Sequence, residues 1–185
     1  MVYDALLCDR RLYDYLLALD RDLAAQARRR GCPGCGGRLD SASYPRKPRG
    51  GPRDPEHQRR LSFCCDACRQ RLTPPSVRFL ARRVYFAAVV VLACTRALTP
   101  GRIVELTALL GVDRRTLRRW RRWWCEEFGQ SAWWRVAKGR LSAPIEPADL
   151  PGGLLERFAG TPERRVAALL AFLAPLTVRS SGHPG

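Results

Sequence analysis

Acidic residues are scarce in this chain, whose 185 residues include 17 aspartates and glutamates against 33 lysines and arginines. The formal net charge of +16 favours a polyanionic partner, either a nucleic acid or an acidic membrane surface. Because the charge is spread along segments with structural periodicity, and is not confined to one amphipathic helix, nucleic acid is the favoured partner.

Long apolar runs are missing as well. The longest apolar stretch, residues 84–94 (VYFAAVVVLAC), is too short to cross a bilayer and is flanked by arginines. We interpret it as the central, buried helix of a small helical domain. The sequence also shows no secretory or lipidation signal, so we expect a cytoplasmic protein with reduced cysteines and no membrane partner.

Groups that support catalysis are few. The acids are scattered, and no strand–helix alternation gathers them around a metal ion as a metal-dependent nuclease requires. A phosphate-binding loop is absent, and a catalytic cysteine would have only His57 or His183 as its base. We therefore predict that the chain is not an enzyme and that any chemistry is performed by another protein.

Cysteine, by contrast, is plentiful, and four of the eight cysteines form two Cys-x-x-Cys turns, CPGC and CDAC. Two such turns can surround one Zn²⁺ tetrahedrally, because two residues between ligands aim both sulfurs at one point. The predicted cofactor is Zn²⁺, and its ligands are Cys32, Cys35, Cys65 and Cys68. A disulfide framework is less favoured because the two turns are so alike. Two alternatives stay open: Cys64 could replace Cys65, and His57 could reach the metal.

The two turns are separated by 29 residues, against about 15–20 in the commonest double-turn zinc pattern. Residues 38–47 and 58–64 are predicted to form two strands, joined by a loop broken by proline and glycine at residues 48–57. Tyr44 and Phe63 offer flat faces among basic side chains, a composition that suits a phosphate backbone. The candidate DNA contacts in this tip are Arg46, Lys47, Arg49, Arg53, Arg59 and Arg60. The alternative is a solvated loop.

Three Thr-Pro pairs predict helix starts, because threonine is a good N-cap and proline costs nothing at the first helical position. These pairs begin at Thr73, Thr99 and Thr161.

The segment from Thr99 to Trp124 predicts a helix-turn-helix. The first helix spans residues 100–110, with Ile103, Leu106, Leu109 and Leu110 inward. Gly111 supplies a left-handed turn and Asp113 caps the second helix. On that helix Leu117, Trp120 and Trp124 recur at the spacing of a buried face, which leaves an arginine face for DNA. The candidate DNA contacts are Arg114, Arg115, Arg118, Arg119 and Arg122. The alternative is a charged face that only solvates the helix.

The order of CPGC, a basic ribbon, CDACR, an apolar helix and ALTPGRIVELTALLGVDRRTLRRWRR resembles the zinc-ribbon and helix-turn-helix modules of bacterial insertion-sequence proteins, particularly the small first-frame proteins that accompany a transposase. The resemblance covers roughly residues 31–124. It implies binding to the ends of a mobile element, with the four cysteines as ligands and Arg114–Arg122 on the DNA. The long ribbon tip and the extra helices at both ends depart from the family pattern.

The expected fold class is mostly α, with a small zinc-bound β-ribbon followed by a helical domain containing the helix-turn-helix. The expected parts are an amphipathic helix (1–30), the ribbon (31–72), the helix-turn-helix domain (73–127), a connection with a last helix (128–177) and a disordered tail (178–185). The predicted function is an accessory factor that binds double-stranded DNA at transposon ends, associates with the nucleoid and recruits a separately encoded transposase. A transcriptional regulator and a non-specific RNA- or DNA-binding protein are the alternatives, and a homo-oligomer is possible through the N-terminal helix.

Overall fold

The computed structural model describes residues 2–80, 84–141 and 143–177, so the expected tail lies outside the described residues. The chain forms two compact units, each assembled from separate stretches of sequence. One, here called the helical unit, contains residues 2–8 and Ala88–Leu169, apart from 142. The other, here called the knuckle unit, contains Asp9–Ala87, apart from 81–83, and residues 170–177.

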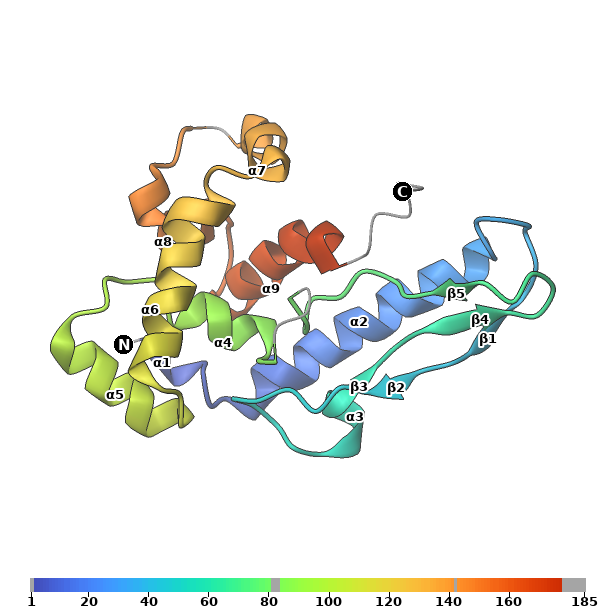
Figure 1. The fold of residues 1–185 in the computed structure, drawn as a ribbon, viewed down its shortest axis with the longest axis horizontal. Helices are drawn as coiled ribbons and strands as arrows, with labels where there is room; N and C mark the ends of the chain where they lie inside the picture. The colour runs from blue at the N-terminus through green and yellow to red at the C-terminus, as the bar shows by residue number, and fades with distance from the viewer. Residues whose placement is uncertain (1, 81–83, 142, 178–185) are drawn as a thin grey trace. The chain divides into compact units, whose positions relative to one another are not determined.

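The described part of the chain is mostly helical with a little antiparallel sheet, as expected (Figure 1). Its longer helical elements are α1 Val2–Ala5, α2 Arg10–Arg30, α3 Pro55–Gln58, α4 Ala87–Leu92, α5 Pro100–Leu110, α6 Arg114–Arg122, the π-helix η1 Trp123–Phe128, α7 Ala132–Ala137, α8 Gly152–Leu155 and α9 Pro162–Leu173. Its strands are β1 Leu39–Ser41, β2 Tyr44–Pro45, β3 Arg59–Arg60, β4 Phe63–Cys65 and β5 Arg71–Leu72. Short 3-10 turns lie at Lys138–Arg140, Pro147–Asp149 and Ala174–Thr177. None of the described helices is both long and apolar enough to cross a membrane.

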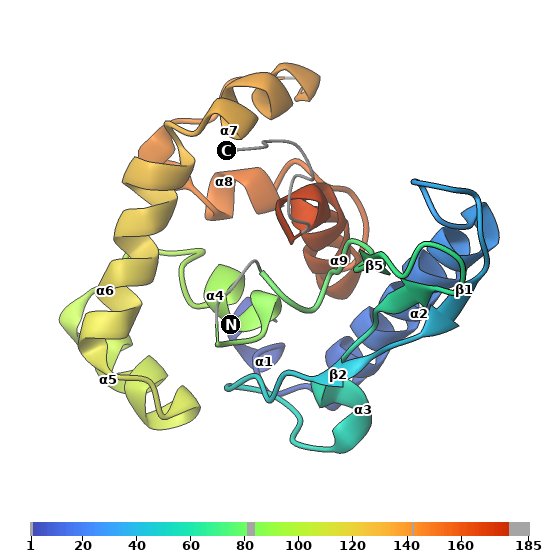
Figure 2. The same cartoon turned by 45° about the vertical axis from the view of Figure 1, so that its right-hand side comes forward.

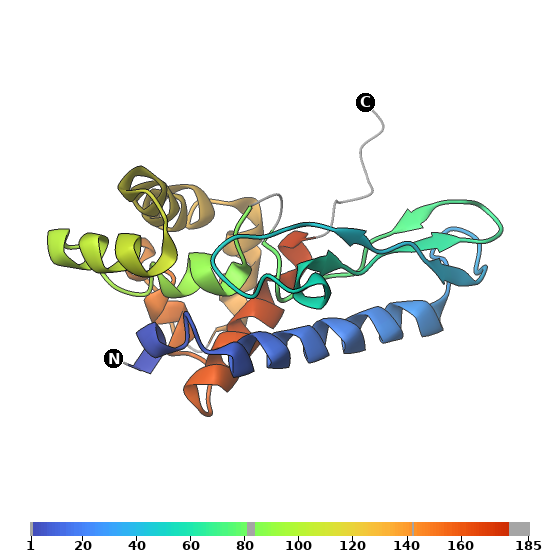
Figure 3. The same cartoon turned by 90° about the horizontal axis from the view of Figure 1, so that it is seen from below.

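In the knuckle unit α2 lies along one face of the sheet (Figure 3). The helix α2 begins at Arg10 because Asp9 caps it: the Asp9 side chain accepts a hydrogen bond from the Arg11 backbone N–H at 2.9 Å. Ala24 on α2 packs against Leu39 and Phe63, whose side chains lie on the inner face of the sheet. This small apolar layer positions both Cys-x-x-Cys turns.

The sheet has the strand order β1-β4-β5, and a second pair joins β2 to β3. Both pairings of the predicted ribbon are antiparallel, with Leu39 opposite Cys65 and Tyr44 opposite Arg60. The third strand, β5, and the short helix α3 in the tip are not expected from the sequence.

A buried ion pair takes the place of the helix predicted to start at Thr73. Residues 73–78 form no helix, and Arg78, which is completely buried, donates from Nε to Asp20 Oδ2 at 2.8 Å. Asp20 also accepts from the backbone N–H of Val77 at 2.7 Å. The prediction was wrong for two reasons. The carboxylate of Asp20, distant in sequence, accepts a hydrogen bond from the Val77 N–H, which a helix would use for its own hydrogen bonds. A residue that precedes a proline also disfavours the helical conformation.

The apolar stretch at residues 84–94 is buried from Tyr85 onward, as predicted, but its helix is shorter than predicted. The helix α4 covers only Ala87–Leu92. Val84 is 59% exposed, and Tyr85 forms a β-bridge with Arg49. Pairing with the ribbon tip therefore replaces the first helical turn.

In the helical unit α5 and α6 are consecutive helices joined by residues 111–113 (Figure 2). Thr99 caps α5, Gly111 is left-handed with φ of 61°, and Asp113 caps α6 by accepting from the Arg115 backbone N–H at 2.7 Å. These local features lie where the sequence predicts them; their role in binding DNA stays a prediction.

One inward position on α5 was predicted wrongly. Leu109 is 49% exposed, whereas Ile103 and Leu106 are buried as expected. The buried face instead includes Arg102, whose Nη2 donates to Asp4 Oδ1 at 2.7 Å. The buried face of α5 is therefore completed by the ion pair between Arg102 and Asp4 of α1, and not by Leu109 as the apolar pattern predicted.

Candidate metal centre and basic surfaces

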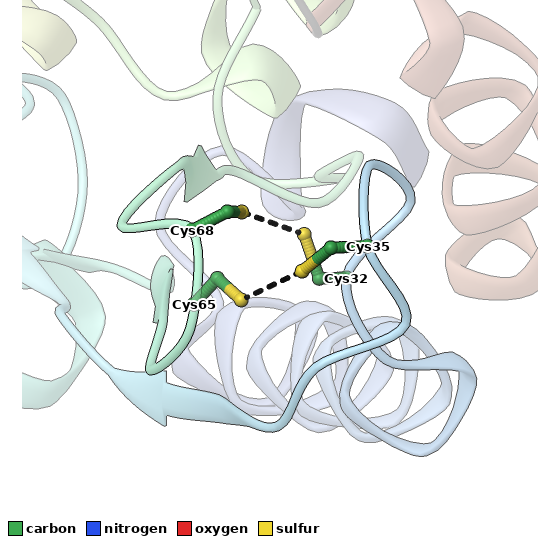
Figure 4. Close-up of side chains that lie close together, drawn as sticks. All are labelled: Cys32, Cys35, Cys65 and Cys68. Carbon is green, nitrogen blue, oxygen red and sulfur yellow. Dashed lines mark hydrogen bonds between the residues drawn. The ribbon is translucent and has the colours of Figure 1, made fainter.

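The four predicted cysteine ligands lie together in the knuckle unit, with their sulfurs directed toward one another (Figure 4). All four sulfurs lie within 4.8 Å of one another, with Cys32 Sγ 3.5 Å from Cys68 Sγ and Cys35 Sγ 3.4 Å from Cys65 Sγ. Tetrahedral coordination with metal–sulfur bonds of about 2.3 Å places sulfurs about 3.8 Å apart, so the spacing fits a metal ion. All eight cysteines are free, which excludes a disulfide framework in this structure.

The two Cys-x-x-Cys turns, called knuckles below, have the same backbone hydrogen bonds. The N–H of Gly36 donates to Cys32 O at 2.8 Å, and the N–H of Arg69 donates to Cys65 O at 3.2 Å. The first cysteine of each knuckle also donates its N–H to the carbonyl five residues later, at 2.9 Å in both. The knuckles are therefore two copies of one local structure.

Backbone and sulfur neighbours shift the pKa values of Cys32 and Cys68 in opposite directions. The backbone N–H of Gly34, followed by that of Cys35, stabilises the thiolate and lowers the pKa of Cys32 to about 7. The Gln70 N–H favours the Cys68 thiolate in the same way, but the sulfur of Cys35, burial and the other sulfurs outweigh it and raise the pKa of Cys68 to about 12. Metal binding must therefore displace the proton that the raised pKa holds on Cys68.

The two alternative ligands are not part of the cluster. Cys64 directs its Sγ at the carbonyl oxygen of Arg69, 3.5 Å away. His57 is 2% exposed and lies between two carboxylates, with Nδ1 2.7 Å from Asp54 Oδ1 and Nε2 3.0 Å from Asp14 Oδ1. The histidine therefore holds α3 to α2 and does not serve the metal centre.

The basic tip divides into inward and outward side chains. Arg60 is 2% exposed, and its Nη2 donates to the carbonyl of Pro74 at 2.5 Å. Arg46 is half-buried, with its guanidinium 5.3 Å from the centre of the Phe79 ring. Burial lowers the pKa of both arginines. The assignment of Arg60 to DNA is therefore wrong, because its guanidinium lies inside the knuckle unit.

The exposed members of the tip are Lys47, Arg49, Arg53 and Arg59. Of the two aromatic residues expected among them, Tyr44 is exposed, but Phe63 is buried in the layer against α2. Phe63 therefore offers no surface to a ligand.

One face of α6 carries five exposed arginines, which line a hollow of about 440 Å³. They are Arg114, Arg115, Arg118, Arg119 and Arg122. The opposite face of the helix is buried through Leu117 and Trp120. None of the five forms an ion pair with a carboxylate in the described part of the chain. The structure thus places all five predicted contacts on one uncompensated surface, here called the α6 arginine face.

Arg121, on the same helix, has a different environment. Its guanidinium donates to the carbonyl of Cys94 at 3.1 Å and to the carbonyls of Leu150 and Ala148. This arginine therefore anchors the helix within its own unit, and the sequence alone gives no sign that it differs from its neighbours.

Two details of residues beside the cysteines were not predicted from the sequence, namely the backbone conformation of Arg69 and the close approach of Gly37 to the second knuckle. Arg69 adopts a left-handed backbone with φ of 61°, and a Cβ atom at Gly37 would lie 2.9 Å from Cys65 Sγ. Aligning CPGCGG with CDACRQ pairs Gly36 with Arg69, and this alignment was the signal that could have revealed the left-handed arginine.

Comparisons of the chain with protein-family models, with curated proteins and with solved structures found no match.

Proposed function

We propose that the protein is a zinc-dependent DNA-binding protein that contacts double-stranded DNA through the α6 arginine face. The observation that carries this proposal is five exposed arginines on one side of a short helix, none paired with a described carboxylate. Like charges held on one surface repel one another. A duplex relieves that repulsion, because the arginines neutralise its phosphates and release the counterions condensed on the DNA.

The dimensions of α6 suit the major groove. An α-helix with its side chains is about 10–12 Å across and the groove is about 12 Å wide, while the nine residues of α6 extend for about 13.5 Å at 1.5 Å per residue. At about 100° per residue the five arginines span an arc of about 140°, with Arg114 and Arg119 at its edges. The edge arginines are positioned for phosphates of the two strands. The central ones, with Arg118 in the middle of the helix, are positioned for guanine O6 and N7.

The knuckles supply the metal dependence. Four thiolates in tetrahedral reach select a soft cation, and a closed set of four protein ligands is typical of structural zinc. Zinc would bind Cys32, Cys35, Cys65 and Cys68 and hold the two knuckles, which follow α2 and β4, in one unit. The exposed tip residues Lys47, Arg49, Arg53 and Arg59 add contacts to the phosphate backbone.

The order of the motifs supports a more specific role, an accessory factor that binds the ends of a transposable element in the nucleoid and leaves catalysis to a separately encoded transposase. The same parts suit a transcriptional regulator or a non-specific nucleic-acid binder. Selection of bound sequences from random duplex DNA, with zinc-loaded protein at physiological salt, distinguishes these roles. A sequence found in element ends supports the first, one confined to a promoter the second, and no enrichment the third.

The test of the α6 contact compares two single substitutions. Arg118→Ala should weaken binding to the selected duplex by about 1–3 kcal/mol, which is about fivefold to 150-fold, and relax the preference at one base position. Arg135→Ala is the matched control, because Arg135 is exposed on α7 and carries the same charge. Equal affinity of the Arg118 variant and the parent would remove the proposal.

A further inference from the structure

A second group of exposed arginines lies in the segments that adjoin the metal centre in sequence. Three form the last turn of α2, immediately before the first knuckle, and the fourth directly follows the last cysteine of the second knuckle. We call Arg28, Arg29, Arg30 and Arg69 the knuckle arginines. Because Cys32 Sγ lies 3.5 Å from Cys68 Sγ, the metal centre brings the two segments together in the knuckle unit (Figure 4).

The knuckle arginines have no nearby compensation. No ion pair joins any of them to a carboxylate among residues 2–80, 84–141 and 143–177. The adjacent Asp66 lies 3.5 Å from Arg38 Nε and is therefore already paired with another cation. Four arginines also exceed the two net negative charges of a zinc ion bound by four thiolates. This surface keeps an excess of positive charge.

The conformation of Arg69 indicates that its side chain is needed. Its φ of 61° is left-handed, a region that disfavours residues with a Cβ atom, and the equivalent position of the first knuckle is Gly36 with φ of 74°. Glycine would form the same hydrogen bond to Cys65 O without this strain. The dipole of α2 favours cations at residues 28–30 but does not account for an arginine on the other knuckle. An unfavourable backbone conformation retained at a surface position points to a function of the side chain.

We propose that the knuckle arginines form a further nucleic-acid contact surface, which binds the phosphate backbone. The proposal rests on the proposed DNA-binding function but concerns residues that the α6 contact does not use. Guanidinium groups carried by the segments on both sides of the metal centre match phosphate oxygens, and contacts of this kind add affinity without reading sequence. The chain then carries a reading helix in the helical unit and, in addition to the exposed tip residues, a backbone clamp in the knuckle unit.

The first experiment measures the salt dependence of duplex binding with the full, zinc-loaded chain. Log K falls as log salt rises, and the steepness of this fall grows by about 0.9 with each phosphate contact. A variant with Arg28, Arg30 and Arg69 changed to Gln should therefore show a slope that is shallower by up to about 2.7. The loss of affinity in this variant should be equal for a selected duplex and for a scrambled duplex. The matched control removes three exposed charges elsewhere, at Arg135, Lys138 and Arg140, and should leave the slope unchanged.

The second experiment separates binding from a role at the metal. Arg69→Gly removes the unfavourable backbone conformation, so zinc retention and the thermal midpoint should be unchanged or higher, while the slope falls by about 0.9. Reduced zinc retention with an unchanged slope would overturn the proposal, as would an unchanged slope in the triple variant or an equal loss in its control. If the salt dependence of duplex binding is unchanged in these variants, the knuckle arginines do not contact nucleic acid, and an acidic protein becomes the partner that fits their charge.

The failure of this proposal is distinguishable from that of the proposed function. Loss of affinity in Arg118→Ala, together with an unchanged slope in the triple variant, removes only the knuckle surface. The reverse result removes only the α6 contact. A parent protein that binds no duplex removes both.

Discussion

Gly36 and Arg69 occupy equivalent places in the two knuckles. Each follows the second cysteine of its turn, each has a left-handed backbone, and each donates its N–H to the carbonyl of the first cysteine. The left-handed residue turns the chain back toward the metal centre, which is why both knuckles need one. The two positions differ only in the side chain they carry.

Gly36→Ala should destabilise the protein by about 1–2 kcal/mol, because alanine disfavours a left-handed backbone. No steric clash contributes, since a Cβ atom at Gly36 would meet nothing within 4 Å. Chemical denaturation of zinc-loaded protein measures the effect, with Arg69→Gly as the partner variant of opposite sign. A neutral Gly36→Ala would show that the knuckle adjusts its backbone freely.

Gly37→Ala should weaken metal binding by a different mechanism. A Cβ atom there would lie 2.9 Å from Cys65 Sγ and 3.2 Å from Ala67 Cβ, so the second knuckle must move away from the first. Competition with a chromophoric zinc chelator should show lower affinity for Gly37→Ala than for Gly36→Ala. Equal affinities would contradict the close approach of the two knuckles.

Removing one partner of the Arg78–Asp20 pair should be costly. Arg78→Met leaves a buried carboxylate without its cation and frees the carbonyls of His57 and Arg59, so a loss of about 3–5 kcal/mol is expected. Denaturant unfolding measures it, and Arg53→Met serves as an exposed control. A loss as small as that of the control would mean that the pair does not hold residues 76–79 on α2.

The protein should lose stability in acid because Asp54, in the tip of the ribbon, must then take up a proton. The His57 side chain, with its backbone N–H, holds the pKa of Asp54 down to about 2. A depressed folded-state pKa contributes stability that is present above the unfolded value near 4 and is lost as the pH falls toward 2. The stability difference between the parent and Asp54→Asn should therefore shrink between about pH 4 and pH 2. A constant difference over that range would contradict the role of the carboxylate.

The sequence predicted the features whose causes are local. Two residues between cysteines fix the geometry of a knuckle, and capping by Thr99 and Asp113 depends on neighbours two or three residues away. Each of these predictions is confirmed because no distant residue competes with the local hydrogen bond.

Features set by distant residues could not be predicted in this way. Arg59 and Arg60 are adjacent and chemically identical, yet only Arg60 is buried, because the register of β3 turns it toward Pro74. The segment before Arg78 is extended because Asp20, far away in the sequence, binds it. Neither the strand register nor this pairing leaves a signal in local composition.

The central claim is that the α6 arginine face binds duplex DNA. The most direct test measures the salt dependence of binding to one selected duplex by the zinc-loaded parent and by a variant with Arg114, Arg115, Arg118, Arg119 and Arg122 changed to Gln. We expect the slope of log K against log salt to become shallower by about 1.8, at about 0.9 for each of the two phosphate contacts of the edge arginines, and the affinity to fall further as the base contacts are lost, with the zinc content unchanged. A variant that keeps the slope and the affinity of the parent would contradict the claim.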